Sequence, residues 1–212
     1  LPEDGGTPRQ ITSGDYHHGG QLQWTPDGKK IVFSANRRTD WEYEPNDSDI
    51  YEISVSDGSL KQITKRQGPD NSPILSPDGK KIAYIGYDDR YQGYQVTNLY
   101  IMNRDGSNSA MVAKFLDRSV GSPVWSRDGK GVYVLYNDKG NGKVAYAPVK
   151  GKIKLVTNNL GGTSIGRPYA SGSFTVAKDG SIAYTTSRPD HPADIAIVSM
   201  KDGTPRKITS LN

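Results

Sequence analysis

The chain has 212 residues, of which only 33% are hydrophobic, and its mean hydropathy is −0.69. We therefore expect several thin cores in a soluble chain without a membrane segment, since no stretch approaches the roughly 20 apolar residues of a transmembrane helix. The net charge of +4 is spread over 27 basic and 23 acidic residues, which argues against a nucleic-acid-binding surface. Cysteine is absent, which excludes disulfides and thiolate catalysis and leaves a periplasmic, secreted or cytoplasmic location open.

The dipeptide Asp-Gly recurs with a period near fifty residues. The four copies that lie within one repeated phrase begin at Asp27, Asp78, Asp128 and Asp179, so their gaps are 51, 50 and 51 residues. Each copy lies between short apolar segments, as in Leu-Gln-Trp-Thr-Pro-Asp-Gly-Lys-Lys-Ile-Val-Phe from residue 22 onward. A repeat of this length, built from short strands and glycine turns, is typical of propeller blades.

Each repeat predicts four antiparallel strands. A first strand ends at the Asp-Gly turn, and a second strand follows it, as at residues 31–35 and 82–86. After a variable gap a third strand is expected in each repeat, and a second glycine turn then leads to a fourth strand. The predicted blades are residues 19–65, 70–115, 120–158 and 170–210.

The chain contains one outer strand more than its four repeats need. It opens with Asp-Gly-Gly-Thr-Pro-Arg-Gln-Ile-Thr and closes with Asp-Gly-Thr-Pro-Arg-Lys-Ile-Thr, so the phrase of a fourth strand stands at both ends. We expect residues 1–14 to be the outer strand of a preceding blade. Residues 1–212 are then an all-β, partial β-propeller from a larger ring of roughly six to eight blades.

Loop length predicts which face of the blades carries function. The long segments 36–48, 87–97 and 158–171 all join a second strand to a third or one blade to the next, so they should lie at the same end. Binding residues usually lie on variable loops held by a rigid scaffold. This end is therefore the candidate functional surface.

Two tryptophans occupy the same position of the repeat. Trp24 and Trp125 each stand three residues before the Asp-Gly turn, where the sister repeats have Leu75 and Val176. Exchange among Trp, Leu and Val indicates that the position requires apolar volume and not ring chemistry. Both tryptophans are expected in the core.

The segment from Gly162 to Gly166 fits the Gly-x-Ser-x-Gly pattern of a serine nucleophile. A nucleophile elbow joins a buried strand directly to a helix, whereas Asn and Gly residues precede Ser164 and Pro168 follows it. We expect a between-blade loop here and no catalytic residue in this chain.

Acidic pairs in the loops do not have the spacing of a metal site. Asp47 with Asp49, and Asp88 with Asp89, lack the glycine turn and distal glutamate of a calcium loop. We expect these carboxylates to be solvated, and neither a metal ion nor another cofactor is predicted.

The repeat phrases Trp-Thr-Pro-Asp-Gly-Lys-Lys-Ile-Val-Phe-Ser and Ser-Pro-Asp-Gly-Lys-Lys-Ile-Ala-Tyr resemble those of TolB-type propellers and of the prolyl oligopeptidase family of serine peptidases. The insertions 40–51, 65–73 and 87–100 resemble the acylaminoacyl-peptidase and dipeptidyl-aminopeptidase branch. This resemblance implies an α/β-hydrolase domain after residue 212, for which the propeller restricts entry to short peptides. It also implies that peptidase activity would belong to that domain.

Two loops contain the candidate substrate-binding residues. Trp41, Glu42, Tyr43 and Glu44 lie in one loop, and Tyr87, Asp88, Arg90 and Tyr91 lie in the equivalent loop one blade on. We expect neighbouring blades to bring these two loops together. Carboxylates and aromatic rings suit an ammonium group. The resemblance implies that Glu42 and Glu44 hold the amino terminus of a peptide, although Tyr43 separates them.

A structural alternative for this loop stands beside the binding role. Trp41 would then fill a gap between blades, and one or both glutamates would pair with Arg37, Arg38 or Arg90. Arg167 follows Gly166 and could contact the hydrolase or a substrate carbonyl, or form a hydrogen bond within the propeller.

We expect the non-catalytic propeller of a serine peptidase that hydrolyses short peptides from the amino end. Its partners would be the hydrolase domain of the same polypeptide and a short peptide substrate, without nucleic acid or membrane. The rival hypothesis is a TolB-like propeller that binds a partner protein and carries no enzyme. An open arc would expose its flanks, so association between copies is a further expectation.

Overall fold

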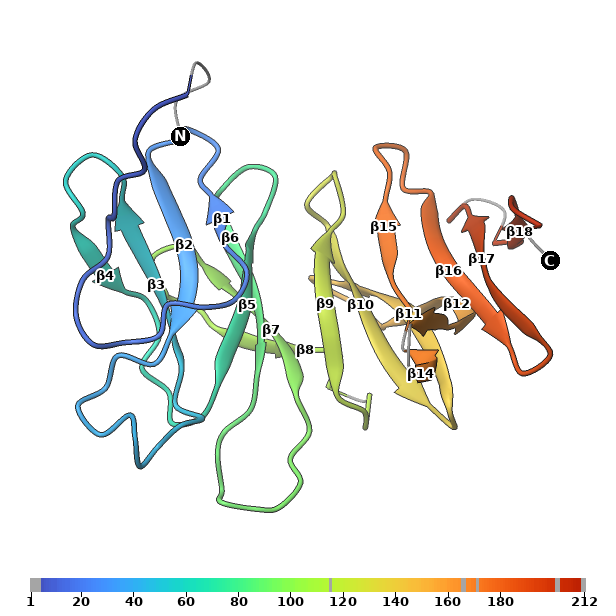
Figure 1. The fold of residues 1–212 in the computed structure, drawn as a ribbon, viewed down its shortest axis with the longest axis horizontal. Helices are drawn as coiled ribbons and strands as arrows, with labels where there is room; N and C mark the ends of the chain where they lie inside the picture. The colour runs from blue at the N-terminus through green and yellow to red at the C-terminus, as the bar shows by residue number, and fades with distance from the viewer. Residues whose placement is uncertain (1–4, 115, 165–166, 171, 201–202, 211–212) are drawn as a thin grey trace.

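The computed structural model describes residues 5–114, 116–164, 167–170, 172–200 and 203–210. These residues form β-strands that pair in antiparallel fashion, and none of them is helical. Figure 1 shows the strands as sheets that follow one another like the blades of a fan. The all-β prediction is therefore confirmed. Within the described ranges, no helix has the length and apolarity required to cross a membrane.

The first two repeats each form a separate four-stranded sheet in simple chain order. The first sheet contains β1 (Gln23–Trp24), β2 (Lys30–Ala35), β3 (Asp49–Ser54) and β4 (Leu60–Gln62). The second sheet contains β5 (Asp70–Leu75), β6 (Lys81–Gly86), β7 (Asn98–Asn103) and β8 (Ala110–Val112). Each strand is joined to the next by a hairpin, as expected for blades.

The third and fourth repeats form two further sets of four strands. The third set contains β9 (Val120–Trp125), β10 (Gly131–Asp138), β11 (Asn141–Pro148) and β12 (Lys154–Leu160). The fourth set contains β15 (Phe174–Val176), β16 (Ile182–Arg188), β17 (His191–Val198) and β18 (Arg206–Lys207). A single residue pair, Leu160 with Thr186, connects the two sets through β12 and β16. The short hairpin of β13 (Gly162–Ser164) and β14 (Arg167–Ala170) lies between them in sequence.

The Asp-Gly turns owe their shape to a side-chain hydroxyl as well as to glycine. In the second blade the Ser76 hydroxyl donates to Asp78 Oδ1 at 2.6 Å and accepts from the Lys81 amide at 2.9 Å. Thr25 and Ser126 make the same contacts in the first and third blades. Gly79 has a φ of +68°, a conformation that favours glycine. The repeated phrase therefore encodes a tight turn between the first and second strands.

Most of the core lies between neighbouring blades. One apolar cluster joins strands of the first two sheets, and it includes Val32, Ile50, Leu75 and Ile82. A second cluster joins the second and third sheets, and a third joins the third and fourth. The thin cores expected from the low hydrophobic content are thus distributed along the array.

The two equivalent tryptophans differ in burial, and the prediction was wrong for one of them. Trp125 is buried, and its indole N–H donates to the Ile74 carbonyl of the preceding blade at 3.0 Å. Trp24 is 57% exposed. The position is covered by the blade that comes before it, and within the described part of the chain no sheet precedes β1. Packing at this position therefore depends on a neighbour and not on the repeat itself.

Residues 5–14, expected as the outer strand of a preceding blade, contain no strand in the structure. Arg9 donates hydrogen bonds to the carbonyls of Val55 and Ser56, in the turn between β3 and β4. Ile11 packs against a cluster that includes Phe33 and Tyr51. None of the described strands pairs with this segment, so its backbone has no partner strand with which to form a ladder. The segment instead packs against the first blade.

The two ends of the blades differ as the loop lengths predicted. In Figure 1 the Asp-Gly turns lie at the upper end, and the loops from β2 to β3 and from β6 to β7 lie at the lower end. The loops that contain the candidate binding residues therefore occupy the same end of neighbouring blades.

Candidate functional site

The loop between β2 and β3 has a defined turn structure. The amides of Tyr43 and Glu44 both donate to the Asp40 carbonyl, at 2.8 and 3.0 Å. The Asn36 side chain donates to the Glu44 carbonyl at 2.7 Å and so ties the start of the loop to its far side. These bonds fix the backbone that carries Trp41, Glu42, Tyr43 and Glu44.

A buried ion-pair network anchors this loop to the second blade. Arg38 lies 3.2 Å from Asp47 and 3.8 Å from Asp49, and it donates to the Arg66 carbonyl at 2.7 Å. Asp47 in turn accepts from the Gly68 amide at 2.7 Å. The prediction that Asp47 and Asp49 are solvated was wrong, because both are buried and Asp49 is only 1% exposed. Their partners are arginine and backbone groups that no local pattern around the two acids reveals.

The Asp49 carboxylate is also part of a clasp between the third and fourth strands. It accepts hydrogen bonds from Gln62 at 2.8 Å and from Thr64 at 3.2 Å, while Thr64 accepts from the Ile50 amide. Burial raises the pKa of Asp49 to about 6, although Arg38 and these two hydrogen bonds oppose the shift. Asp49 is therefore a titratable group beneath the candidate loop.

Arg66 forms the second arm of the network. It pairs with Asp70, which is fully buried, and with Asp88 at 3.3 Å. Its guanidinium lies over the Tyr100 ring, 4.2 Å from the centroid. The absence of a side chain at Gly86 makes room for it, because a Cβ there would lie 2.5 Å from an Arg66 nitrogen. The segment that joins β4 to β5 is thus held by Arg66, which forms ion pairs with Asp70 and Asp88, and by the hydrogen bond from Arg38.

The two candidate loops meet, as the sequence predicted. The Tyr91 hydroxyl donates to Glu44 Oε1 at 3.1 Å and accepts from the Gln67 side chain at 2.6 Å. The hydrogen bond to Glu44 raises the pKa of the Tyr91 phenol. The Asp89 carboxylate accepts from the Tyr91 amide at 2.7 Å and holds that loop in shape. Glu44 is therefore held by a hydrogen bond between the two loops.

Glu42 differs from Glu44 in having an open carboxylate. It lines a cavity of about 460 Å³ together with Trp41 and residues of the first blade and the neighbouring loops. The His17 ring meets the Trp41 ring edge to face, with centroids 5.8 Å apart. Among the described residues, no hydrogen bond or ion pair reaches the Glu42 side chain. The cavity therefore combines an apolar wall with an uncompensated negative charge.

The arginines expected as partners of the glutamates have other contacts. Arg37 donates to the Ser13 carbonyl at 3.1 Å and lies over the Tyr16 ring. Arg38 forms ion pairs with the buried Asp47 and Asp49, as described above. In the described structure neither Glu42 nor Glu44 pairs with an arginine, so that alternative was wrong for these three arginines. For Arg38 the physical reason is that the buried carboxylates of Asp47 and Asp49 form ion pairs with it.

Of the remaining candidates, three line a second cavity and one lies on the open surface. Tyr87, Asp88 and Arg90 line a smaller cavity of about 270 Å³ with Tyr94 and Tyr100. Tyr43 is 86% exposed at the tip of its loop. The side chain of Arg167 lies outside the described residues, as do those of Ser164 and its neighbours. Ser164 ends β13, which pairs with β14 and does not lead into a helix.

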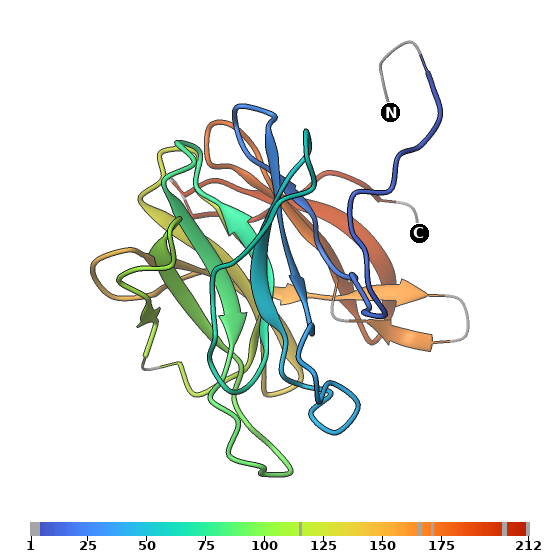
Figure 2. The same ribbon diagram turned by 90° about the vertical axis from the view of Figure 1, so that its left-hand side faces the viewer.

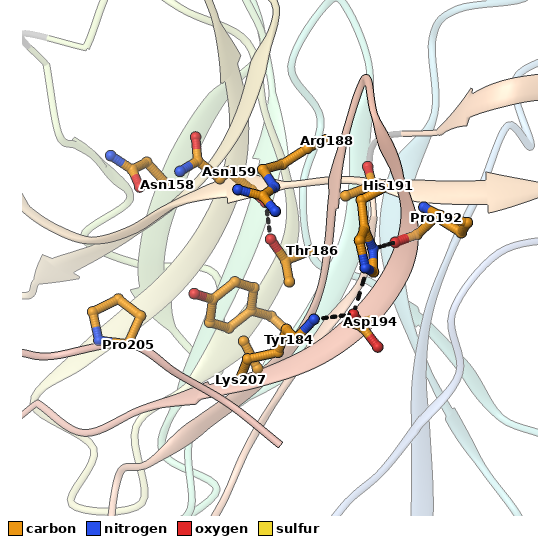
Figure 3. Close-up of a pocket in the computed structure, with 12 residues that line it drawn as sticks. Asn158, Asn159, Tyr184, Thr186, Arg188, His191, Pro192, Asp194, Pro205 and Lys207 are labelled. Carbon is orange, nitrogen blue, oxygen red and sulfur yellow. Dashed lines mark hydrogen bonds and ion pairs between the residues drawn. The ribbon is translucent and has the colours of Figure 1, made fainter. Parts of the chain in front are cut away.

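A third cavity of about 340 Å³ lies between β12 of the third blade and the fourth blade, and Figure 3 shows its polar lining. Asp194 is buried there and accepts from Lys207 at 2.7 Å and from Thr209 at 2.8 Å, while His191 lies 3.6 Å away. Thr209 also accepts from the Ile195 amide at 2.8 Å. Asp194 and Thr209 thus repeat the clasp of Asp49 and Thr64. This carboxylate has a structural role in the blade.

Sequence reasoning missed the buried clasp and several polar residues that line the 460 Å³ cavity, among them His17, Asn36 and Asn71. The clasp has a sequence signal, because Asp-Ile lies in the third strand and Ile-Thr directly follows the fourth in both the first and last repeats. No comparable signal marks the cavity residues, which come from three separate segments. In the described part of the chain, no group of three potential ligand side chains could hold a metal ion.

Comparison with known proteins agrees with this architecture. Dipeptidyl-peptidase 5 of Porphyromonas gingivalis is 28% identical over 195 residues, which cover 90% of this chain and 27% of that protein. Among solved structures, TolB of Acinetobacter baumannii superposes with a TM-score of 0.67 at 22% identity, over 95% of this chain and 45% of that one. The acylaminoacyl peptidase of Pyrococcus horikoshii superposes with a TM-score of 0.62 at 19% identity, over 91% and 27%.

These structural similarities show the fold alone, and the chain spans only about a quarter of the peptidase relative that it matches. The chain is homologous to that peptidase and has structural neighbours among the propellers of related peptidases. The family description "TolB beta propeller domain" matches residues 5–200. That match covers nearly the whole chain and agrees with the antiparallel blades of the structure. The chain therefore belongs to the TolB β-propeller domain family.

Proposed function

We propose that this chain is the propeller of a longer serine peptidase, in which it restricts access to short peptides and binds their amino terminus. The similarity to a dipeptidyl peptidase extends over 90% of the chain and leaves most of that relative outside the match. The remaining part of such a protein would supply the α/β-hydrolase domain and the catalytic residues. The propeller would contribute substrate selection.

The observation that carries this proposal is the open carboxylate of Glu42 on the 460 Å³ cavity. A peptide ammonium group placed there would gain a charge-assisted hydrogen bond with a carboxylate that no described residue neutralises. Trp41, which lines the same cavity, would contact that group or the first side chain of the peptide. Glu44, held by Tyr91, would fix the loop and not the ligand.

The test is Glu42→Gln in the full-length protein that contains this chain. Gln keeps the shape and removes the charge, so KM should rise about tenfold for a dipeptide substrate with a free amino terminus, with little change in kcat. The same substrate with an acetylated amino terminus should be unaffected. Asp190→Asn, which removes an exposed charge on the fourth blade, is the matched control.

Equal kinetics of the wild type and Glu42→Gln on the free-amine substrate would contradict the amine-binding role. A parent sequence without a hydrolase domain would contradict the peptidase assignment as a whole. These two results are separable, because the second can be read from the gene.

A TolB-like protein-binding propeller is the second candidate function. Its support is the family match together with exposed aromatic side chains at the loop end, since Tyr43, Tyr91 and Tyr94 are all largely exposed. Exposed tyrosines are frequent anchors in protein interfaces. Recovery of one stoichiometric protein partner by the wild type, and its loss on Tyr43→Ala with Tyr94→Ala, would favour this function.

We also propose that the longer protein contains further four-stranded sheets of the propeller, one of which precedes the first blade. The exposed flank of the first blade, with Trp24 and Leu22, supports a preceding sheet that would cover it as the second blade covers Trp125. The number of blades in the ring, the blade boundaries given above and any association between copies stay predictions.

A further inference from the structure

A groove between the second and third blades differs in character from the candidate substrate site. It has a volume of about 620 Å³ and runs between β8 and the turn that joins β11 to β12. Figure 2 shows these two segments side by side at the left of the molecule. The apolar side chains that line it are Met111, Val112, Ala113, Pro148, Val149 and Ile153. We name it the lysine-rimmed groove, after Lys114 and Lys152.

The floor of the lysine-rimmed groove is firmly built. Val112, Ala113, Val149 and Ile153 pack on their inner sides against the apolar cluster between the second and third blades. Each of them is only half-buried, so apolar surface remains open toward the groove. A ligand with apolar side chains would cover that surface and gain the corresponding hydrophobic free energy.

The rim carries charge of one sign. Lys114 and Lys152 line the groove and are exposed, while Lys150 and Lys154 flank Lys152 in sequence. None of these four lysines forms an ion pair within the described residues, and no carboxylate is among the groove-lining residues. The charge therefore favours an occupant that carries carboxylates.

The edge of the second blade supplies a third element of recognition. Among the described strands, β8 pairs with β7 alone, so its other edge presents backbone groups without a strand partner. The strand is just three residues long, and Ala113 directly after it has a φ of +59°. An extended peptide can add to such an edge through main-chain hydrogen bonds, which a lipid tail cannot make.

We propose that the lysine-rimmed groove binds an extended acidic peptide segment of a partner protein, with alternate apolar side chains on the groove floor and carboxylates at Lys114 and Lys152. This site lies on the outer rim of the blades and does not depend on the amine-binding role of Glu42.

The probe is a fluorescein-labelled peptide of alternating valine and glutamate residues, titrated with the chain and followed by fluorescence anisotropy. Binding should weaken at least tenfold in the double variant Lys114→Glu with Lys152→Glu, and it should weaken with added salt. The control double variant is Lys139→Glu with Lys178→Glu, which changes the net charge equally at turns remote from the groove. It should bind as the wild type does. Circular dichroism verifies that each variant is folded.

Hydrogen exchange locates the peptide independently of the variants. The amides of residues 110–112 should exchange more slowly in the complex, whereas those of β4 should not change. Absence of binding, equal weakening in both double variants, or equal binding of a valine and lysine peptide would overturn the proposal. Binding of phosphatidylglycerol vesicles without binding of the peptide would also overturn it, in favour of a lipid surface.

Discussion

The Tyr91 hydroxyl donates a hydrogen bond to the Glu44 carboxylate, 3.1 Å away, and thereby joins two loops that belong to different blades. Because the carboxylate stabilises the protonated phenol, it raises the pKa of Tyr91. The same bond distinguishes Glu44 from Glu42, two residues earlier in the same loop.

Glu44→Gln should therefore lower the pKa of Tyr91 toward the ordinary value for tyrosine. Carbon-13 NMR of labelled tyrosine rings, followed through an alkaline titration, measures that pKa directly. Glu42→Gln is the matched control and should leave the Tyr91 titration unchanged. An unchanged titration in Glu44→Gln would show that the two loops do not stay in contact in solution.

Asp49 predicts a specific dependence of stability on pH. Its pKa in the folded chain, about 6, lies above the usual 3.8, so the folded state binds this proton more tightly than the unfolded state. Protonation between about pH 6 and pH 4 therefore stabilises the fold. The free energy of unfolding of the wild type, relative to that of Asp49→Asn, should rise by roughly 2–3 kcal/mol as the pH falls from 7 to 4.

Urea denaturation at a series of pH values measures this difference. Asp105→Asn is the control, because hydrogen bonds with Ser107 lower the pKa of Asp105 and give it no such rise in this window. Parallel stability curves for the wild type and Asp49→Asn would contradict the burial of a titratable carboxylate at this position.

The turn hydroxyls predict a graded loss of stability. Ser76→Ala removes a buried hydroxyl that bonds both Asp78 and the Lys81 amide, so the free energy of unfolding should fall by about 1–2 kcal/mol. Ser107→Ala is the matched control, since Ser107 makes a similar bond to Asp105 but is exposed. Thermal unfolding should show a clear decrease for the first variant and a small one for the second. Equal decreases in stability for the two variants would show that burial of the hydroxyl does not determine its contribution to stability.

The equivalent tryptophans predict opposite outcomes for the same substitution. Trp125→Ala removes a buried ring and leaves the Ile74 carbonyl without its donor, so it should cost about 3–5 kcal/mol. Trp24→Ala changes an exposed ring and should cost less than about 1 kcal/mol in the isolated chain. Chemical denaturation of the two variants tests this.

The longer protein proposed above would allow a second test of Trp24. If a preceding sheet covers it there, Trp24→Ala should become as costly as Trp125→Ala. A small effect in both contexts would contradict the proposed preceding sheet. Sedimentation of the isolated chain is a companion measurement, because an open flank with Trp24 and Leu22 favours self-association.

The fold was predictable because its signals are local and repeated. The Asp-Gly turn determines one hairpin in each of the four repeats, and a hydroxyl such as that of Ser76 supports the turn in the first three. The loop end and the meeting of the two loops followed from the order of the strands. Burial at Trp24 was not predictable in the same way, because it depends on what lies beside the blade.

The candidate site was predictable only in part. The loop that carries Glu42 stands out by its length and composition, but the partition of roles between Glu42 and Glu44 depends on Tyr91, 47 residues further along the chain. The burial of Asp47 and Asp49 depends on Arg38 and on backbone groups of the next blade. Such contacts arise from the stacking of blades, which a single repeat does not encode.

A contact between the first two blades shows how far the repeats have diverged. Glu52 is buried in the first blade and pairs with Lys30 and with Arg104 of the second, each at 2.7 Å. The turn position of Arg104 is held by Val55 in the first blade and by Val149 in the third. If a copy of the first or third blade were placed after the first blade, a valine would replace Arg104. Glu52 would then remain buried with Lys30 as the only one of its two cationic partners. The contacts between neighbouring blades therefore depend on the order of the blades, and a rearranged protein would also require a substitution at Glu52.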